Sequence, residues 1–218
     1  MYYPRAIEDR LLAASEQFPV LLVTGPRQVG KTTVLRHLCG AERRYLSPDD
    51  PMLRSLATED PALLLARFPP PVLIDEVQYA PGLLPLIKMA VDESPRPGAF
   101  WLTGSQQFHT MKGITESLAG RVAIVNLLGF SARERSRRRC DLPPFLPTTE
   151  RLGERALTPG RTRLAALYQD IWLGSFPALI AGPVRDRDLF YSSYVQTYLE
   201  RDVRDLAQIR DRRPSSAS

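Results

Sequence analysis

Cysteine is scarce in this chain, which has only two among its 218 residues. Cys39 and Cys140 form neither a C-x-x-C pair nor a metal-ligand spacing. So few cysteines exclude a small scaffold held together by disulfides. We therefore expect reduced thiols and no structural zinc.

Long hydrophobic runs are also missing. No apolar run approaches the roughly 18 residues that a membrane-spanning helix needs, and residues 1–5 lack the apolar region of a signal peptide. These absences predict a soluble, cytoplasmic protein without a membrane span, although docking on a membrane protein stays open.

A strong excess of one charge is the third absence. The chain has 29 basic and 24 acidic residues, which gives a net charge of +5. This balance is compatible with a nucleic-acid partner but favours a mildly basic surface. The arginine cluster within 133–139 has the same two interpretations, a solvated polar helix or linker and a nucleic-acid contact, and we favour the first.

Hydrophobic residues make up 44% of the chain, enough for one α/β core and a small second unit. Apolar runs bounded by proline and glycine predict strands, and apolar residues at helical spacing predict helices between them. This alternation predicts an α/β fold with a mostly parallel sheet covered on both faces. The predicted strands are 18–24, 44–46, 72–76, 99–103 and 121–127, and the predicted helices are 6–17, 52–57, 61–68, 83–91 and 109–118.

The segment 25–33 satisfies the phosphate-binding loop pattern G-x-x-x-x-G-K-[ST]. A predicted strand precedes it and helical residues follow it, which is the setting that the motif requires. Glycines let the backbone N–H groups curl around a β-phosphate, and the helix adds its positive N-terminal end. The nucleoside triphosphate is therefore expected to contact Gly25, Pro26, Arg27, Gln28, Val29, Gly30, Lys31, Thr32 and Thr33.

Two side chains of this loop are expected to have specific roles. Lys31 supplies an ammonium group that follows charge across the β- and γ-phosphates, and the Thr32 hydroxyl is placed to bind Mg²⁺. Thr33 is better explained as an ordinary helix residue.

Asp75 and Glu76 end the predicted strand that begins at Val72. The carboxyl ends of strands in an open α/β sheet border the ligand crevice. We expect Asp75 to hold Mg²⁺, directly or through water, and Glu76 to polarise the attacking water. Such an acid favours hydrolysis over transfer to a small acceptor, and a solvated acidic turn is the alternative interpretation.

Polar residues after the predicted strand 99–103 offer a third contact. Ser105, or alternatively Thr103, is expected to sense the γ-phosphate or orient the water, while a helix cap is the other interpretation of Ser105. Arg121 has two interpretations of equal weight. It is either an arginine finger for its own or a neighbour's nucleotide, or a surface charge at the start of a strand.

The pattern changes after Phe130. Prolines within 142–147 prevent regular structure, so we expect a first domain over 1–140, a linker over 141–162 and a partial helical domain over 163–218. A long helix is predicted over 186–209. Its apolar stripe needs a larger cover than one other helix provides, so we expect exposed side chains at Val195, Leu199 and Val203.

Together these motifs resemble a known family, the AAA-like P-loop ATPases of bacteria and archaea that carry a C-terminal domain of unknown function. The resemblance implies an additional-strand sheet of order 5-1-4-3-2, ATP as substrate, and Asp75 and Glu76 as the metal and water pair. It implies no biological role. The segments that carry it are 25–33, 73–78, 102–105, 117–121 and 198–204.

Two features depart from that family. The segment 174–178 lacks the usual double-glycine turn ending in an acid, and the chain stops soon after Ile209, where family members continue. A natural truncation, a shifted reading frame or an experimentally shortened chain would each produce this ending.

The prediction is thus an enzyme, an Mg²⁺-dependent ATPase that uses hydrolysis to rearrange an attached domain or partner. The alternative is a nucleotide-gated binding module, associated with DNA, with slow or lost hydrolysis. A small-molecule kinase comes third, because no acceptor site or arginine-rich lid stands out. ATP and Mg²⁺ are the expected ligands, a protein or DNA is the expected partner, and an oligomer stays open.

Overall fold

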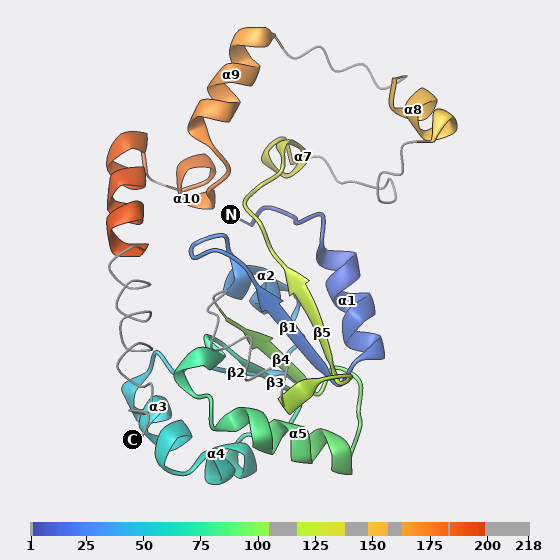
Figure 1. Ribbon diagram of the computed structural model, residues 1–218, viewed down its shortest axis with the longest axis vertical. Coiled ribbons are helices and arrows are strands. Elements are labelled where there is room, and N and C mark those ends of the chain that lie inside the picture. The colour runs from blue at the N-terminus through green and yellow to red at the C-terminus, as the bar shows by residue number, and fades with distance from the viewer. Residues whose placement is uncertain (1, 105–116, 138–147, 157–162, 183, 199–218) are drawn as a thin grey trace, which may run out of the picture. The chain divides into compact units, whose positions relative to one another are not determined.

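The computed structural model describes residues 2–104, 117–137, 148–156, 163–182 and 184–198. Within this part of the chain, parallel strands form one five-stranded sheet of order β2-β3-β4-β1-β5 (Figure 1). This order is the predicted 5-1-4-3-2 read from the other edge, so the predicted fold class is confirmed. The strands are β1 (Val20–Thr24), β2 (Arg44–Leu46), β3 (Val72–Ile74), β4 (Phe100–Thr103) and β5 (Val122–Asn126).

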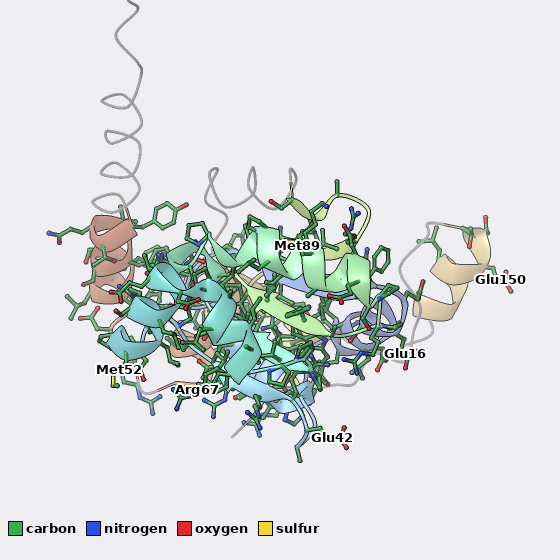
Figure 2. All side chains as sticks on the ribbon, turned by 90° about the horizontal axis from the view of Figure 1, so that it is seen from below. Glu16, Glu42, Met52, Arg67, Met89 and Glu150 are labelled. Atoms are coloured by element: carbon green, nitrogen blue, oxygen red, sulfur yellow. The ribbon has the colours of Figure 1, made fainter. Side chains whose placement is uncertain are left out.

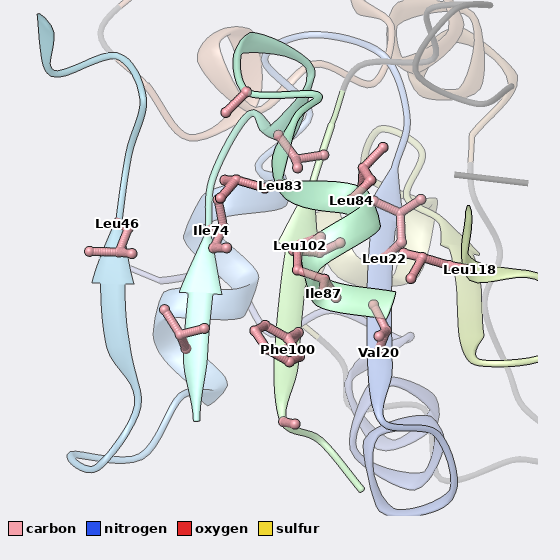
Figure 3. Close-up of a cluster of buried hydrophobic side chains, with 14 of the residues drawn as sticks. Val20, Leu22, Leu46, Ile74, Leu83, Leu84, Ile87, Phe100, Leu102 and Leu118 are labelled. Atoms are coloured by element: carbon pink, nitrogen blue, oxygen red, sulfur yellow. The ribbon is translucent and has the colours of Figure 1, made fainter. Parts of the chain in front are cut away.

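Helices cover both faces of the sheet. On one face, side chains of α3 (Pro51–Glu59), α4 (Pro61–Arg67) and α5 (Leu83–Glu93) join alternate strand residues in one buried cluster. Figure 3 shows the part of this cluster formed by α5 and the strands, including Leu83, Ile87 and Phe100. On the other face, α1 (Glu8–Gln17) and α2 (Lys31–Leu38) pack against the intervening strand residues. Because the central strands are buried on both sides, they read in the sequence as continuous apolar runs.

Two Asp-Pro pairs begin consecutive helices. The Asp50 carboxylate accepts a hydrogen bond from the backbone N–H of Met52 at 2.8 Å, and Asp60 does the same for Leu63 at 2.8 Å. The proline that follows each aspartate suits the first helical position, where a backbone donor is not needed. These caps explain why α3 and α4 separate at Asp60.

The outer faces of these helices are open to solvent. Met52 on α3 and Met89 on α5 are 81% and 64% exposed (Figure 2). By contrast, Ile87, two residues before Met89, is fully buried. The helical period therefore separates a core face from a solvent face along α5.

The interval expected to be a linker contains a helix, α8 (Thr149–Ala156). The expected proline run ends at Pro147, and no further proline occurs before Pro159, so nothing in the intervening residues prevents helix formation. Farther upstream, α7 (Ala132–Arg135) accounts for the start of the arginine cluster. Most of the helix expected over 109–118 lies outside the described residues.

The chain divides into two compact units, residues 1–160 with 175–177, and residues 161–174 with 178–218. The second unit contains α9 (Leu164–Leu173) and a helix that begins at residue 187 and is described up to residue 198. The short helix α10 (Pro177–Ile180) lies at the division. Val195 is 50% exposed, as expected, whereas Leu199 and Val203 lie outside the described residues.

Contacts within the second unit hold its two longer helices together. The Arg187 guanidinium lies 3.8 Å from the centre of the Trp172 ring, and the Tyr191 hydroxyl donates to the Leu173 carbonyl at 3.2 Å. Gly174 has φ +80°, and a side chain there would meet the Tyr191 hydroxyl at 1.9 Å, so glycine is required. In the part of the chain described, no helix has the length and apolar character to cross a membrane.

Candidate functional site

The loop 25–33 connects the carboxyl end of β1 to the start of α2. Positive φ angles occur at Gly25 (+141°), Gln28 (+60°) and Gly30 (+93°). A Cβ atom on Gly25 would lie 2.1 Å from the Leu127 carbonyl oxygen, so only glycine fits there. The sequence pattern therefore corresponds to a wound backbone loop that ends at a helix N-terminus.

Lys31 lies at this N-terminus and is only 5% exposed. Its ammonium group donates to the Gly25 carbonyl at 3.1 Å and to the Pro26 carbonyl at 2.9 Å. Burial lowers the pKa of Lys31, and the nearby Glu76 carboxylate partly opposes that shift. The loop thus holds a desolvated cation whose charged form would be favoured by a bound phosphate.

Asp75 follows β3 and lies beside the loop, with 5% of its surface exposed. Its carboxylate accepts hydrogen bonds from the Thr32 hydroxyl at 2.8 and 3.0 Å, from the Tyr45 hydroxyl at 2.8 Å and from the Thr103 hydroxyl. The structure therefore brings together Thr32 and Asp75, the two residues predicted to hold Mg²⁺.

Glu76 has a left-handed backbone with φ +49°, which is uncommon for a residue with a side chain and concentrates at functional sites. Its backbone N–H donates to the Thr103 hydroxyl oxygen at 2.9 Å, and the Gln78 amide donates to its carboxylate. This backbone turn directs Asp75 and Glu76 into different surroundings, one buried and one half-buried.

Ser105 lies outside the described residues, so its predicted role stays a prediction. Thr103, the alternative, is fully buried, and its hydroxyl donates to the Asp75 carboxylate and accepts from the Glu76 backbone N–H. It is therefore the residue on β4 that the structure places at the site.

Arg121 is not near the loop of its own chain. It immediately precedes β5 and its carbonyl accepts from Val20 N–H, so it lies at the amino end of the strands, opposite the loop. Its side chain pairs with Asp92 and donates to the Ala119 carbonyl. Of the two interpretations of Arg121, this position supports the surface charge at the start of a strand and does not support a contact with its own nucleotide, because residues before and after a parallel strand lie at opposite ends of the sheet. A contact with a neighbour's nucleotide stays a proposal.

Tyr45 is a site residue that the sequence did not reveal. It lies on β2, next to β3, and burial and its bond to Asp75 raise the pKa of Tyr45 to about 12. The Arg36 guanidinium lies 4.8 Å from the centre of its ring. A tyrosine in a short edge strand carries no motif, and only the strand order places it beside Asp75.

The residues present fit a nucleotide with Mg²⁺. One nitrogen of the Arg27 guanidinium is buried without a hydrogen-bond partner. The N-cap residue of α2 is Gly30, which offers no side-chain cap, and the first turn of α2 contains no acid. Both features leave donors for an anion. Hydroxyl and carboxylate oxygens such as those of Thr32 and Asp75 are the ligands that Mg²⁺ prefers.

A parallel sheet of this order, with a phosphate-binding loop that contains a lysine after β1 and an acid after β3, defines a P-loop nucleotide-binding protein. The chain belongs to the AAA domain family, whose family model matches residues 17–136. A second model, for a domain of unknown function, matches residues 164–216. The predicted family resemblance is thus confirmed, and the matches support an ATP-binding P-loop protein.

Similar proteins include uncharacterized proteins of Mycobacterium bovis and Mycobacterium tuberculosis. Each is 30% identical to this chain over 199 residues, which are 90% of this chain and 39% of the relative. The chain therefore spans about two fifths of the length of these relatives. Among solved structures, a Walker-type ATPase of Pyrococcus abyssi is 19% identical with a TM-score of 0.49, and the match covers 98% of this chain and 77% of that one.

Proposed function

We propose that this protein is an Mg²⁺-dependent ATPase that couples hydrolysis to a rearrangement of its helical C-terminal part or of a partner. The observation that carries the proposal is that Asp75 and Glu76 lie beside Thr32 of the phosphate-binding loop 25–33. ATP hydrolysis needs hydrogen-bond donors that hold the phosphates, ligands for the metal ion and a carboxylate that activates water.

In this proposal the loop and Lys31 bind the β- and γ-phosphates, while Thr32 and Asp75 hold the metal ion. Bound Mg²⁺ neutralises negative charge on the phosphate oxygens. Tyr45 and Thr103 fix the Asp75 carboxylate through their hydroxyl groups. Arg27, with its unpartnered buried nitrogen, adds a second cation beside Lys31.

Glu76 orients a water molecule and accepts its proton as the water oxygen attacks the γ-phosphorus. The bond between the γ-phosphorus and the bridging oxygen breaks, and that oxygen leaves as part of ADP. Gln78, which donates to the Glu76 carboxylate, limits the orientations of this base. Such a positioned base contributes typically 10²- to 10⁴-fold to a rate.

The domain division at 1–140, 141–162 and 163–218 belongs to the same proposal, with hydrolysis in the first part and its mechanical effect in the last. We assign the protein to the cytoplasm. A protein or DNA is the proposed partner, and an oligomer would let Arg121 approach a neighbour's nucleotide.

Substitution of Lys31 tests the nucleotide site. Lys31→Ala removes charge-assisted contacts to the phosphates worth about 1.5 to 3 kcal/mol, which is roughly 10- to 150-fold in affinity. Titration of ATP in the presence of Mg²⁺ measures this change. Lys88→Ala is the matched control, because Lys88 forms a surface pair with Asp92 on α5. Equal affinities in both variants would contradict the proposed site.

A nucleotide-gated binding module is the second candidate. It is favoured by exposed apolar side chains on α9, where Leu164, Ile171 and Trp172 are 62% to 68% exposed. Such a surface suits a partner more than a catalytic step. ATP binding without phosphate release, together with a partner or salt-dependent DNA affinity that changes with ATP, would support this candidate over the ATPase.

A further inference from the structure

Arg5 is a buried cation that the proposed catalytic arrangement does not use. It lies before α1 and is 7% exposed. Its guanidinium donates to the Glu134 carboxylate at 2.9 Å, to the Val29 carbonyl at 2.9 Å and to the Leu128 carbonyl at 2.7 Å. One side chain therefore joins the N-terminal segment, the phosphate-binding loop and the segment that follows β5.

Glu134 holds this guanidinium in a fixed position. The carboxylate is 7% exposed and accepts from the backbone N–H of Ala6 at 2.9 Å and of Ser131 at 2.6 Å. Burial raises the pKa of Glu134, but these hydrogen bonds and Arg5 outweigh burial and keep the pKa below its ordinary value. Because a buried ion pair usually adds little net stability, we consider a role for Arg5 at the adjacent phosphate-binding loop.

The geometry at Val29 indicates what that role is. The backbone φ angles of Gln28 and Gly30 on either side of Val29 are +60° and +93°. In a trans peptide, the carbonyl of one residue and the N–H of the next point in opposite directions. A guanidinium that holds the Val29 carbonyl therefore directs the Gly30 N–H to the other side of the loop, away from Arg5.

Arg5 also packs against the loop backbone from outside. A Cβ atom placed on Gly30 would lie 3.7 Å from the Arg5 guanidinium. Lys31, which begins α2 directly after Gly30, donates to Gly25 and Pro26 carbonyls across the loop. The loop is thus constrained by Arg5 from one side and by Lys31 from the other.

We propose that Arg5 is a positioning residue for phosphate binding, which fixes the Val29–Gly30 peptide so that its N–H is presented to the phosphate chain of the nucleotide. This proposal rests on the proposed nucleotide site and adds a residue outside the phosphate-loop pattern. Arg5 acts through the loop and does not touch the nucleotide.

Arg5→Lys tests the proposal, because lysine keeps the positive charge but cannot donate in a planar fork to three acceptors. We expect the Kd for Mg²⁺-ATP and the Kd for inorganic tripolyphosphate, both measured by calorimetry on the folded chain, to rise by the same factor, on the order of tenfold. An equal factor is expected because the Gly30 N–H serves the phosphates that the two ligands share.

Arg43→Lys is the matched control. Arg43 also donates to a backbone carbonyl, that of Val72, and lies 4.1 Å from the centre of the Trp101 ring. Arg43 immediately precedes β2, at the end of the sheet opposite the loop. The affinities of Arg43→Lys for ATP and tripolyphosphate should therefore stay within about twofold of the parent chain, although its stability falls.

If Arg5→Lys does not fold, a second variant tests the same proposal. The double variant Arg5→Gln with Glu134→Gln leaves no buried unpaired charge, and we expect it to bind both ligands on the order of tenfold more weakly than the parent chain. Parent-like affinities in a folded Arg5 variant, or a loss for ATP without a loss for tripolyphosphate, would overturn the inference alone. A parent chain that binds neither ligand would instead contradict the proposed function.

Discussion

At the residue scale, the candidate site depends on Asp75, whose carboxylate accepts from three hydroxyl groups, those of Thr32, Tyr45 and Thr103. These donors come from α2, β2 and β4, while Asp75 itself follows β3. Hydrogen bonds such as those from Tyr45 and Thr103 orient a metal ligand and tune the affinity of the site for the metal ion. The placement of Asp75 is thus a property of the folded sheet.

Removal of one of these donors should weaken Mg²⁺ binding without destroying the site. Tyr45→Phe deletes the hydroxyl that holds the Asp75 carboxylate, so we expect the Mg²⁺ concentration that gives half-maximal ATP binding to rise about tenfold. Titration of Mg²⁺ at fixed ATP measures this change. Tyr168→Phe, on an exposed residue of α9, is the control and should leave the titration unchanged. A parent-like titration in Tyr45→Phe would show that Tyr45 does not orient Asp75.

At the element scale, the strands and helices follow from local patterns. β1 is five consecutive buried residues, and α3 and α4 begin at Asp-Pro pairs that the sequence displays openly. The two faces of α5 should differ in their contribution to stability. Leu83 and Ile87 join the core cluster (Figure 3), whereas Met89 is exposed to solvent.

A pair of substitutions on α5 tests this division. Ile87→Ala removes a fully buried side chain and should lower the free energy of unfolding by about 2 to 5 kcal/mol, from lost transfer energy and a cavity. Met89→Ala, on the exposed face of the same helix, should change it by no more than about 0.5 kcal/mol. Urea denaturation measures both. Equal losses would mean that α5 is not packed on the sheet as described.

Part of the site could be predicted because its residues lie in contiguous motifs. The loop 25–33 and the acids after β3 can each be recognised from the neighbouring residues in the sequence. Tyr45 and Arg5 could not, because their roles arise from pairing between β2 and β3 and from a contact with Glu134 that spans 129 positions in the sequence. The two interpretations of Arg121 could not be separated from the sequence, because proximity to a motif in sequence does not say at which end of the strands a residue lies.

At the scale of the whole molecule, the two family matches fall largely in different compact units. Residues 17–136 lie in the first unit, and residues 164–216 lie in the second except for 175–177. The first unit contains the residues of the candidate site that the structure describes. The second contributes exposed apolar side chains on α9. In the proposed ATPase, the first unit hydrolyses ATP and the second unit carries the resulting rearrangement. The central requirement of the proposal is that the first unit turns ATP over.

Release of inorganic phosphate from Mg²⁺-ATP tests this requirement most directly. The parent chain should release phosphate. Glu76→Gln should bind ATP with a Kd within about twofold of the parent value but release phosphate at least about 100-fold more slowly. Glu93→Gln, at the exposed end of α5, should match the parent chain. Equal release by the parent chain and Glu76→Gln, or no release by the parent chain at saturating ATP, would contradict the assignment of this protein as an ATPase that uses Glu76.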